Sequence, residues 1–145
     1  MGKTNWKRVF LGGLVAGVVL PILELASMPL FMPQWVSVMQ SLLEHPIPTE
    51  YSVGDIVFGV VFSVILGIVI IWLYAAIRPR LGAGPKTAVI AGLFVWFLSA
   101  LNDIAYSLSV FHLFPLKAVL IRSFSIIVPF ILAALAGAWV YKEQE

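Results

Sequence analysis

The hydrophobic pattern of the chain consists of four long apolar runs, separated by short stretches that are rich in proline or in charge. The runs extend over residues 9–32, 56–77, 87–111 and 118–141. About 20 apolar residues are enough for a helix to cross a hydrocarbon core about 30 Å thick. Inside lipid the backbone has to satisfy its own hydrogen bonds, and four segments are too few to close a barrel. The pattern therefore predicts an all-α membrane protein, a four-transmembrane-helix bundle that forms one transmembrane domain over residues 1–145.

The stretches between the runs predict two further features. Apolar residues recur at helical spacing from Gln34 to Glu44, which favours a short amphipathic helix on the membrane surface; a solvated loop is the alternative. The stretch Arg78–Lys86 combines glycine, proline and basic residues and predicts a compact basic turn. Its end, Gly84–Thr87, lacks the spacing of a phosphate-binding loop and follows a membrane helix instead of a strand. We interpret it as a turn and a helix start.

An internal similarity relates the two halves of the chain. Without gaps, the first run aligns with the third so that Gly13 pairs with Gly92 and Glu24 with Asp103. The second run aligns with the fourth through an aromatic pair in each, Trp72 with Tyr74 and Trp139 with Tyr141. The similarity suggests two parallel helical hairpins of common design. The alternative is that aromatic residues gather at membrane interfaces for their own reasons.

Composition supports a membrane protein and gives it an orientation. Hydrophobic residues make up 61% of the chain and charged residues 11%, so the lipid bilayer has to cover most of the surface. Cysteine is absent, which excludes disulfides and thiolate chemistry. The few basic residues form clusters beside apolar runs instead of one stripe, which argues against nucleic-acid binding.

The basic residues also predict the topology. If the four spans alternate in direction, seven of the basic residues fall on the same side of the membrane: Lys3, Lys7, Arg8, Arg78, Arg80, Lys86 and Lys142. We therefore expect both termini to be cytoplasmic.

The first run also has the outline of a signal peptide, because three basic residues precede it. However, the run continues as far as Met32, and Glu24–Ser27 lacks the small residues at alternate positions that a cleavage site needs. We expect an uncleaved first span.

Small residues at four-residue spacing predict where helices pack. In lipid, such residues let helix backbones approach closely. Packing within the chain is the favoured interpretation, and a homodimer face is the alternative. The residues concerned are Gly13, Gly17, Gly59, Ser63, Gly67, Ala133 and Gly137.

Charged residues inside the runs predict one buried polar layer. At about 1.5 Å per residue, Glu24 and Asp103 stand at a similar height in their spans, and Arg122 reaches that height from the opposite side. We expect one carboxylate to pair with Arg122, with Asn102 and Ser125 close by. The alternatives are an ion pair that only fixes helix register, or an arginine that reaches out to the headgroups.

Metal, cofactor and catalytic sites are not predicted. The two histidines, His45 and His112, lie in or beside loops, and a zinc site would need Glu44, Glu50 or Asp103 as a further ligand. No nucleophile, base and orienting group occur together, so an enzyme is the least favoured class.

Several segments resemble a family of uncharacterised four-span bacterial membrane proteins. The resemblance implies a bacterial inner membrane and no particular activity. Members of that family carry a polar or acidic residue in the middle of the fourth span, where this chain has Ile126–Pro129. The segments that carry the resemblance are Trp6–Arg8, Leu11–Gly17, Leu73–Arg80, Gly84–Ala88, Leu135–Trp139 and Tyr141–Glu143.

Two functions are compatible with these features. The first is a noncatalytic subunit or helix-packing partner of a larger membrane complex or of a homo-oligomer, because the short loops leave no room for a soluble domain. The second is a small transporter or channel for protons, cations or small solutes, built around Glu24, Asp103 and Arg122.

Overall fold

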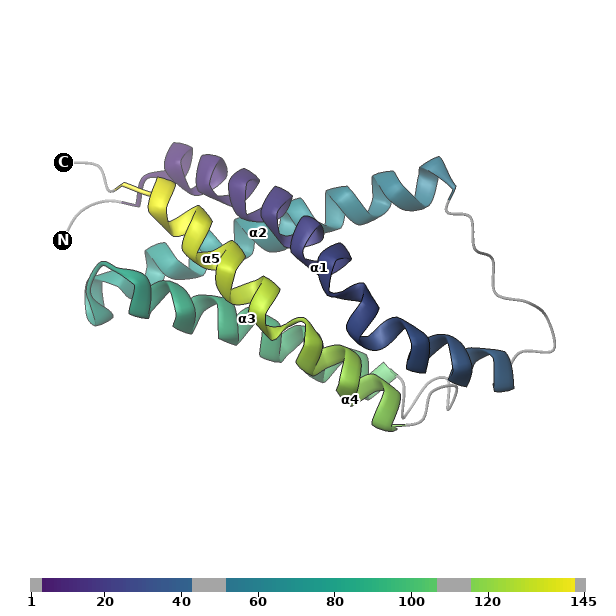
Figure 1. Ribbon diagram of the computed structural model, residues 1–145. Helices are drawn as coiled ribbons and strands as arrows, with labels where there is room; N and C mark the ends of the chain where they lie inside the picture. Colours follow the sequence, from purple (N-terminus) through teal and green to yellow (C-terminus); the bar gives the residue numbers. More distant parts are fainter. Residues whose placement is uncertain (1–3, 43–51, 107–115, 143–145) are drawn as a thin grey trace.

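In the computed structural model, which describes residues 4–42, 52–106 and 116–142, every regular element is a helix (Figure 1). The helices are α1 (Trp6–Leu42), α2 (Val53–Leu81), α3 (Pro85–Tyr106), α4 (Leu116–Ser125) and α5 (Ile127–Val140). Four segments are long and apolar enough to cross a membrane: Trp6–Pro33, Val53–Leu81, Pro85–Tyr106 and Val119–Val140. The predicted all-α four-helix bundle is confirmed, and the chain is a multi-pass membrane protein.

Two helices extend further than the apolar pattern predicts. Helix α1 continues through Pro33 to Leu42, so the region after Pro33 is helical; its place on the membrane surface stays a prediction. Figure 1 shows that α1 bends in its second half, which contains two of its three prolines, and proline is the usual cause of such bends. Helix α2 includes Pro79 and ends at Leu81, where the Gly82 N–H donates to the Arg78 carbonyl at 2.9 Å. The predicted basic turn is therefore divided between the last turn of α2, a short connection over residues 82–84 and the beginning of α3 at Pro85.

The fourth span is two helices instead of the single one that the sequence predicts. The helix is interrupted at Ile126, between α4 and α5. Pro129 explains the break, because proline has no N–H for the Ser125 carbonyl and its ring would collide with that carbonyl. Helix α5 begins beyond the break, where the Phe130 N–H donates to the Ile126 carbonyl at 3.2 Å. The third predicted span ends beyond Tyr106, in a part of the chain outside the described residues.

Helices α1 and α2 cross in very close contact at glycines. A Cβ placed on Gly13 would lie 2.6 Å from the Cα of Ile68, and a Cβ on Gly17 would lie 2.5 Å from the Cα of Val64. From the other side, Gly67 faces the backbone of both Gly13 and Gly17. Since the neighbouring atoms are backbone, a side chain here could be accommodated only by moving a helix.

Two further crossings join α5 to the rest of the bundle. A Cβ on Gly92 of α3 would lie 2.8 Å from both the Ala134 Cβ and the Phe130 carbonyl oxygen of α5. Gly12 of α1 and Gly137 of α5 face each other, each with a Cβ position 2.6 Å from the other's carbonyl oxygen. Helix α5 therefore packs against both α1 and α3.

The crossings match between the two hairpins, α1 with α2 and α3 with α4 and α5. In the alignment described above, Gly13 corresponds to Gly92 and Gly67 corresponds to Ala134. Gly13 and Gly67 face each other in the first hairpin, and Gly92 and Ala134 face each other in the second. Equivalent positions of the alignment thus make equivalent contacts.

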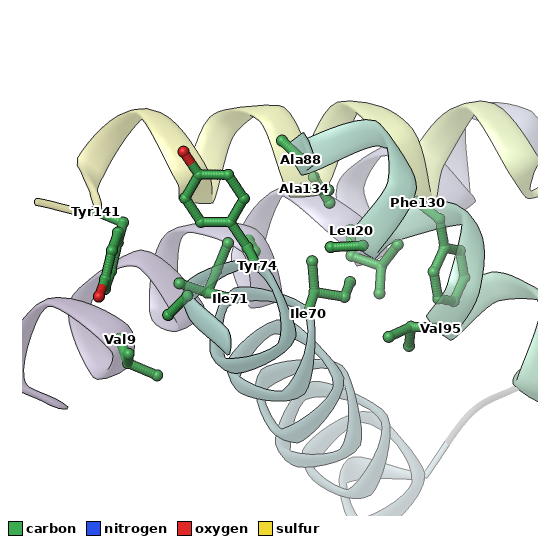
Figure 2. Close-up of a cluster of buried hydrophobic side chains, with 14 of the residues drawn as sticks. Val9, Leu20, Ile70, Ile71, Tyr74, Ala88, Val95, Phe130, Ala134 and Tyr141 are labelled. Atoms are coloured by element: carbon green, nitrogen blue, oxygen red, sulfur yellow. The ribbon is translucent and has the colours of Figure 1, made fainter. Parts of the chain in front are cut away.

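A buried apolar cluster fills the space between the crossings. Figure 2 shows side chains from α1, α2, α3 and α5 meeting in it, among them Leu20, Ile70, Val95 and Phe130. All four of these side chains are almost completely buried. The cluster continues to Tyr141 at the end of the bundle where α1 begins and α5 ends.

Of the seven small residues expected to pack, six are buried and Gly59 is not. A Cβ on Gly59 would meet nothing within 4 Å, so the expectation that it packs within the chain is wrong for the described residues. The reason is that α2 diverges from α1 on the far side of their crossing, as Figure 1 shows at the beginning of α2. All ten residues of Val53–Phe62, which we call the free segment of α2, are exposed.

Candidate functional site

Three charged side chains come together at the far end of the bundle, opposite the end where α1 begins. They are the residues that the sequence predicts for a polar layer: Glu24 on α1, Asp103 on α3 and Arg122 on α4. Arg122 Nη1 lies 3.4 Å from Asp103 Oδ2, an ion pair between the two helices of the second hairpin. The Arg122 side chain is 47% exposed and the Asp103 side chain 31%. The pair therefore lies at the edge of the bundle and not in its core.

Glu24 completes the layer from the first hairpin. Its side chain is half-buried and close enough to interact electrostatically with both Arg122 and Asp103. One turn further along α1, the Ser27 hydroxyl donates to the Glu24 carbonyl at 2.8 Å. The layer has two carboxyl groups and one guanidinium group, so the arginine cannot neutralise both acids.

The two polar residues expected close to the layer contribute less. Asn102 is exposed, because consecutive residues of a helix project about 100° apart and Asp103 occupies the inward direction. Ser125 is half-buried, but its hydroxyl donates to the Ile121 carbonyl of its own helix at 2.8 Å.

Two residues that the sequence analysis did not identify support the layer. The Trp96 indole N–H donates to the Ser123 carbonyl at 2.7 Å and thereby ties α3 to α4, one residue from Arg122. The Ser123 side chain is 2% exposed, and its hydroxyl has no hydrogen-bond partner in the described part of the chain. The hydrogen bond from Trp96 could not be predicted from the sequence, because any backbone carbonyl can accept a hydrogen bond from an indole.

The layer can hold charge within the span, but it does not assemble a metal site. Among the described residues, no three histidine, cysteine or carboxylate side chains are grouped so that they could hold a metal ion. His45, His112, Glu44 and Glu50 lie outside the described residues. An intramembrane group of this kind suits a proton, a cation or a polar contact from a partner helix.

A second polar cluster closes the opposite end of the bundle. Arg78 lies over the ring of Tyr141 at 5.5 Å, and Tyr74 meets the same ring edge-on at 5.8 Å. The Asn5 N–H donates to the Tyr141 hydroxyl at 3.4 Å, and the Gly84 N–H donates to the Tyr74 hydroxyl at 3.3 Å. The start of α1, the turn between α2 and α3, and the end of α5 are therefore held together at one end, which we call the basic end.

Comparisons of the chain with protein-family models, with curated proteins and with solved structures gave no match.

Proposed function

We propose that the protein is a noncatalytic subunit of a larger membrane complex, and that the free segment of α2 is the surface that receives a transmembrane helix of its partner. The observation that carries the proposal is the exposure of all ten residues of Val53–Phe62. Because α2 diverges from α1 beyond their crossing, Val53–Phe62 gains no packing energy from other helices of its own chain. The remaining contacts are then open to another helix.

The chemistry of the free segment suits a helix better than it suits lipid alone. Gly59 continues the small-residue row of Ser63 and Gly67, which faces α1 further along the same helix. Beside it, Phe58 and Phe62 are stacked with ring centroids 6.3 Å apart, so one wall of the surface is already ordered. A small residue next to a large, ordered one offers the shape complementarity on which helix association in membranes depends.

The proposed orientation has the basic end in the cytoplasm of a bacterial cell and the polar layer toward the outer side of the inner membrane. It is supported by the concentration of Lys and Arg at the basic end. Single cysteines test it, since the chain has none. A membrane-impermeant maleimide added outside spheroplasts should label Ser41→Cys and leave Ala83→Cys unlabelled. The reverse pattern would invert the proposed topology.

Photo-crosslinking in cells tests the partner surface. A photoreactive amino acid replaces Val57 in the free segment or, as the matched control, Val69, which is also exposed on α2 but lies beyond the crossing. We expect a discrete crosslinked protein band from position 57 and none from position 69. Mass spectrometry of the band identifies the partner, and a band of twice the chain's mass would identify it as a second copy.

A competing variant makes the experiment decisive. Gly59→Leu places a large side chain on the free segment, at a position where a Cβ meets nothing within 4 Å. The variant should fold normally but lose the crosslink from position 57. Crosslinks to lipid alone at both positions, or a protein band that Gly59→Leu leaves unchanged, would contradict the subunit proposal.

Transport is a second candidate, which the half-exposed Arg122–Asp103 pair beside Glu24 favours. Charged groups that remain accessible inside a span commonly mark ion or proton pathways. Purified protein in liposomes should then dissipate a proton or cation gradient. Glu24→Gln and Asp103→Asn should abolish the flux without unfolding the protein. Absence of any flux with the native chain would exclude this candidate.

A further inference from the structure

A groove runs between the beginning of α3 and the end of α5, on the membrane-facing side of the basic end. It has a volume of about 470 Å³, which lies in the range of about 300–1,000 Å³ typical of sites for small ligands. Its lining is apolar, with small side chains between larger ones. The residues are Gly84, Pro85, Ala88, Leu135, Ala136, Ala138 and Trp139.

The position of the groove indicates which part of a bilayer it meets. Trp139 lies at its edge and is 87% exposed, as expected for an indole at the headgroup level of a membrane. Leu135 lies one helical turn before Trp139 on α5 and therefore deeper in the span. The groove thus begins near the headgroups and extends along the hydrocarbon, which is the direction that an acyl chain takes.

Charge at the mouth of the groove favours an anion. The basic end carries six described cationic side chains, whereas the three described carboxylates belong to the rest of the bundle. The sequence outside the described residues adds one positive charge, Lys3, and two negative charges, Glu143 and Glu145, so the net charge of these terminal and turn segments remains positive. The described cations are Lys7, Arg8, Arg78, Arg80, Lys86 and Lys142.

Two of these cations lie close in sequence to residues that line the groove. Lys86 is exposed and lies in the chain between two lining residues, Pro85 and Ala88. Lys142 is exposed and follows the lining residue Trp139 by three positions. Both lysines belong to segments that line the groove, and their long, flexible side chains can bring the ammonium groups to a headgroup.

We propose that this groove is a binding site for one anionic phospholipid. An acyl chain lies along the alanines of α3 and α5, Trp139 covers the glycerol region, and Lys86 and Lys142 hold the phosphate. The proposal does not depend on the subunit role, because it concerns the opposite end of the bundle from the free segment of α2.

Native mass spectrometry of the full chain in a mild detergent tests the site. The protein is titrated with phosphatidylglycerol or with phosphatidylcholine of the same acyl composition. We expect one tightly bound phosphatidylglycerol, with an apparent affinity about tenfold or more above that for phosphatidylcholine, because two lysines near a headgroup favour an anionic lipid by that order. Equal binding of the two lipids would overturn the proposal.

Matched variants locate the bound lipid. Ala136→Leu fills the groove, and Ala76→Leu makes the same change at an exposed alanine of α2 outside it. Lys86→Gln removes a proposed phosphate contact, and Lys7→Gln removes an exposed cation of the same end on α1. We expect Ala136→Leu to abolish the preferential adduct, Lys86→Gln to weaken it several-fold, and both controls to retain it.

Lys86→Gln changes only an exposed side chain and is not expected to unfold the protein, so a failure of Ala136→Leu to fold would not remove the test. Retention of the full adduct by Lys86→Gln, or an equal loss in Lys7→Gln, would refute the assignment.

Discussion

The crossing of α1 and α2 makes a quantitative prediction for the substitution Gly67→Ala. A Cβ at position 67 would lie 2.7 Å from the Gly17 Cα and closer still to backbone atoms of Gly13 and Gly17. Carbon atoms pack best at about 3.5–4.0 Å, so the helices would have to separate by about 1 Å. No rotation of a side chain can relieve this overlap, because the opposing atoms belong to the backbone.

Two opposing effects decide the size of the change. Overpacking typically costs about 1–3 kcal/mol, and we expect the upper end of this range because the partner is backbone. Replacing glycine by alanine inside a helix returns about 1 kcal/mol. The free energy of unfolding should therefore fall by about 2 kcal/mol, a factor of about 30 in the equilibrium constant.

The same helix supplies the control. Gly59 lies in the same row of small residues as Gly67, but a Cβ there meets nothing within 4 Å. Gly59→Ala should therefore leave the free energy of unfolding unchanged or raise it by up to about 1 kcal/mol through helix propensity alone. Both variants can be compared with the native chain by titration of purified protein from mild detergent into sodium dodecyl sulfate, with tryptophan fluorescence as the signal.

The comparison has a clear refuting outcome. If Gly67→Ala unfolds at the same detergent composition as the native chain, the helices do not cross in contact at Gly67. If Gly59→Ala is as damaging as Gly67→Ala, the free segment of α2 is packed within the chain, and the proposed partner surface does not exist.

Three further predictions concern polar side chains. Ser123→Ala removes a buried hydroxyl that has no hydrogen-bond partner among the described residues, and it should raise the free energy of unfolding by about 1 kcal/mol. Ser125→Ala loses a hydrogen bond and should not raise it; a loss of stability in Ser123→Ala would show that the Ser123 hydroxyl is satisfied. Ser52→Ala removes the capping box of α2 and should accelerate amide hydrogen exchange in its first turn by a factor equivalent to about 1 kcal/mol; unchanged exchange would contradict the cap. Arg122→Leu should lower the melting temperature, because it leaves the Asp103 side chain without its partner; an unchanged melting temperature would argue against the ion pair.

The sequence predicted the four spans well because the requirement for crossing a bilayer is local. Length and apolarity of a segment decide it, and neither depends on the other helices. The positions at which two helices meet depend instead on how the helices pack against each other. Gly59 and Gly67 are equivalent in local sequence, since both continue one row of small residues on α2. Only the angle at which α2 crosses α1 determines that Gly67 is covered and Gly59 is not.

The candidate site likewise has features that the sequence predicts and features that only the packing of the helices determines. Height along a span follows from counting residues, so Glu24, Asp103 and Arg122 could be assigned to one level before any contact was known. Direction around a helix depends on packing, and Asn102 was therefore grouped with its sequence neighbour although it projects elsewhere. The Trp96 hydrogen bond to Ser123 joins two helices whose relative position no local pattern encodes.

The fourth span is broken at a position where the second span is regular. In the alignment that pairs Trp72 with Trp139, Phe62 corresponds to Pro129 and Gly59 corresponds to the break at Ile126. Pro129 interrupts the fourth span, and α4 on the far side of the break contacts α1 and α3, where Arg122 pairs with Asp103. Phe62 has the backbone N–H that proline lacks, so α2 stays helical through the equivalent position. One residue type therefore accounts for the break in the fourth span, whereas the divergence of α2 follows from the angle at which it crosses α1 (Figure 1).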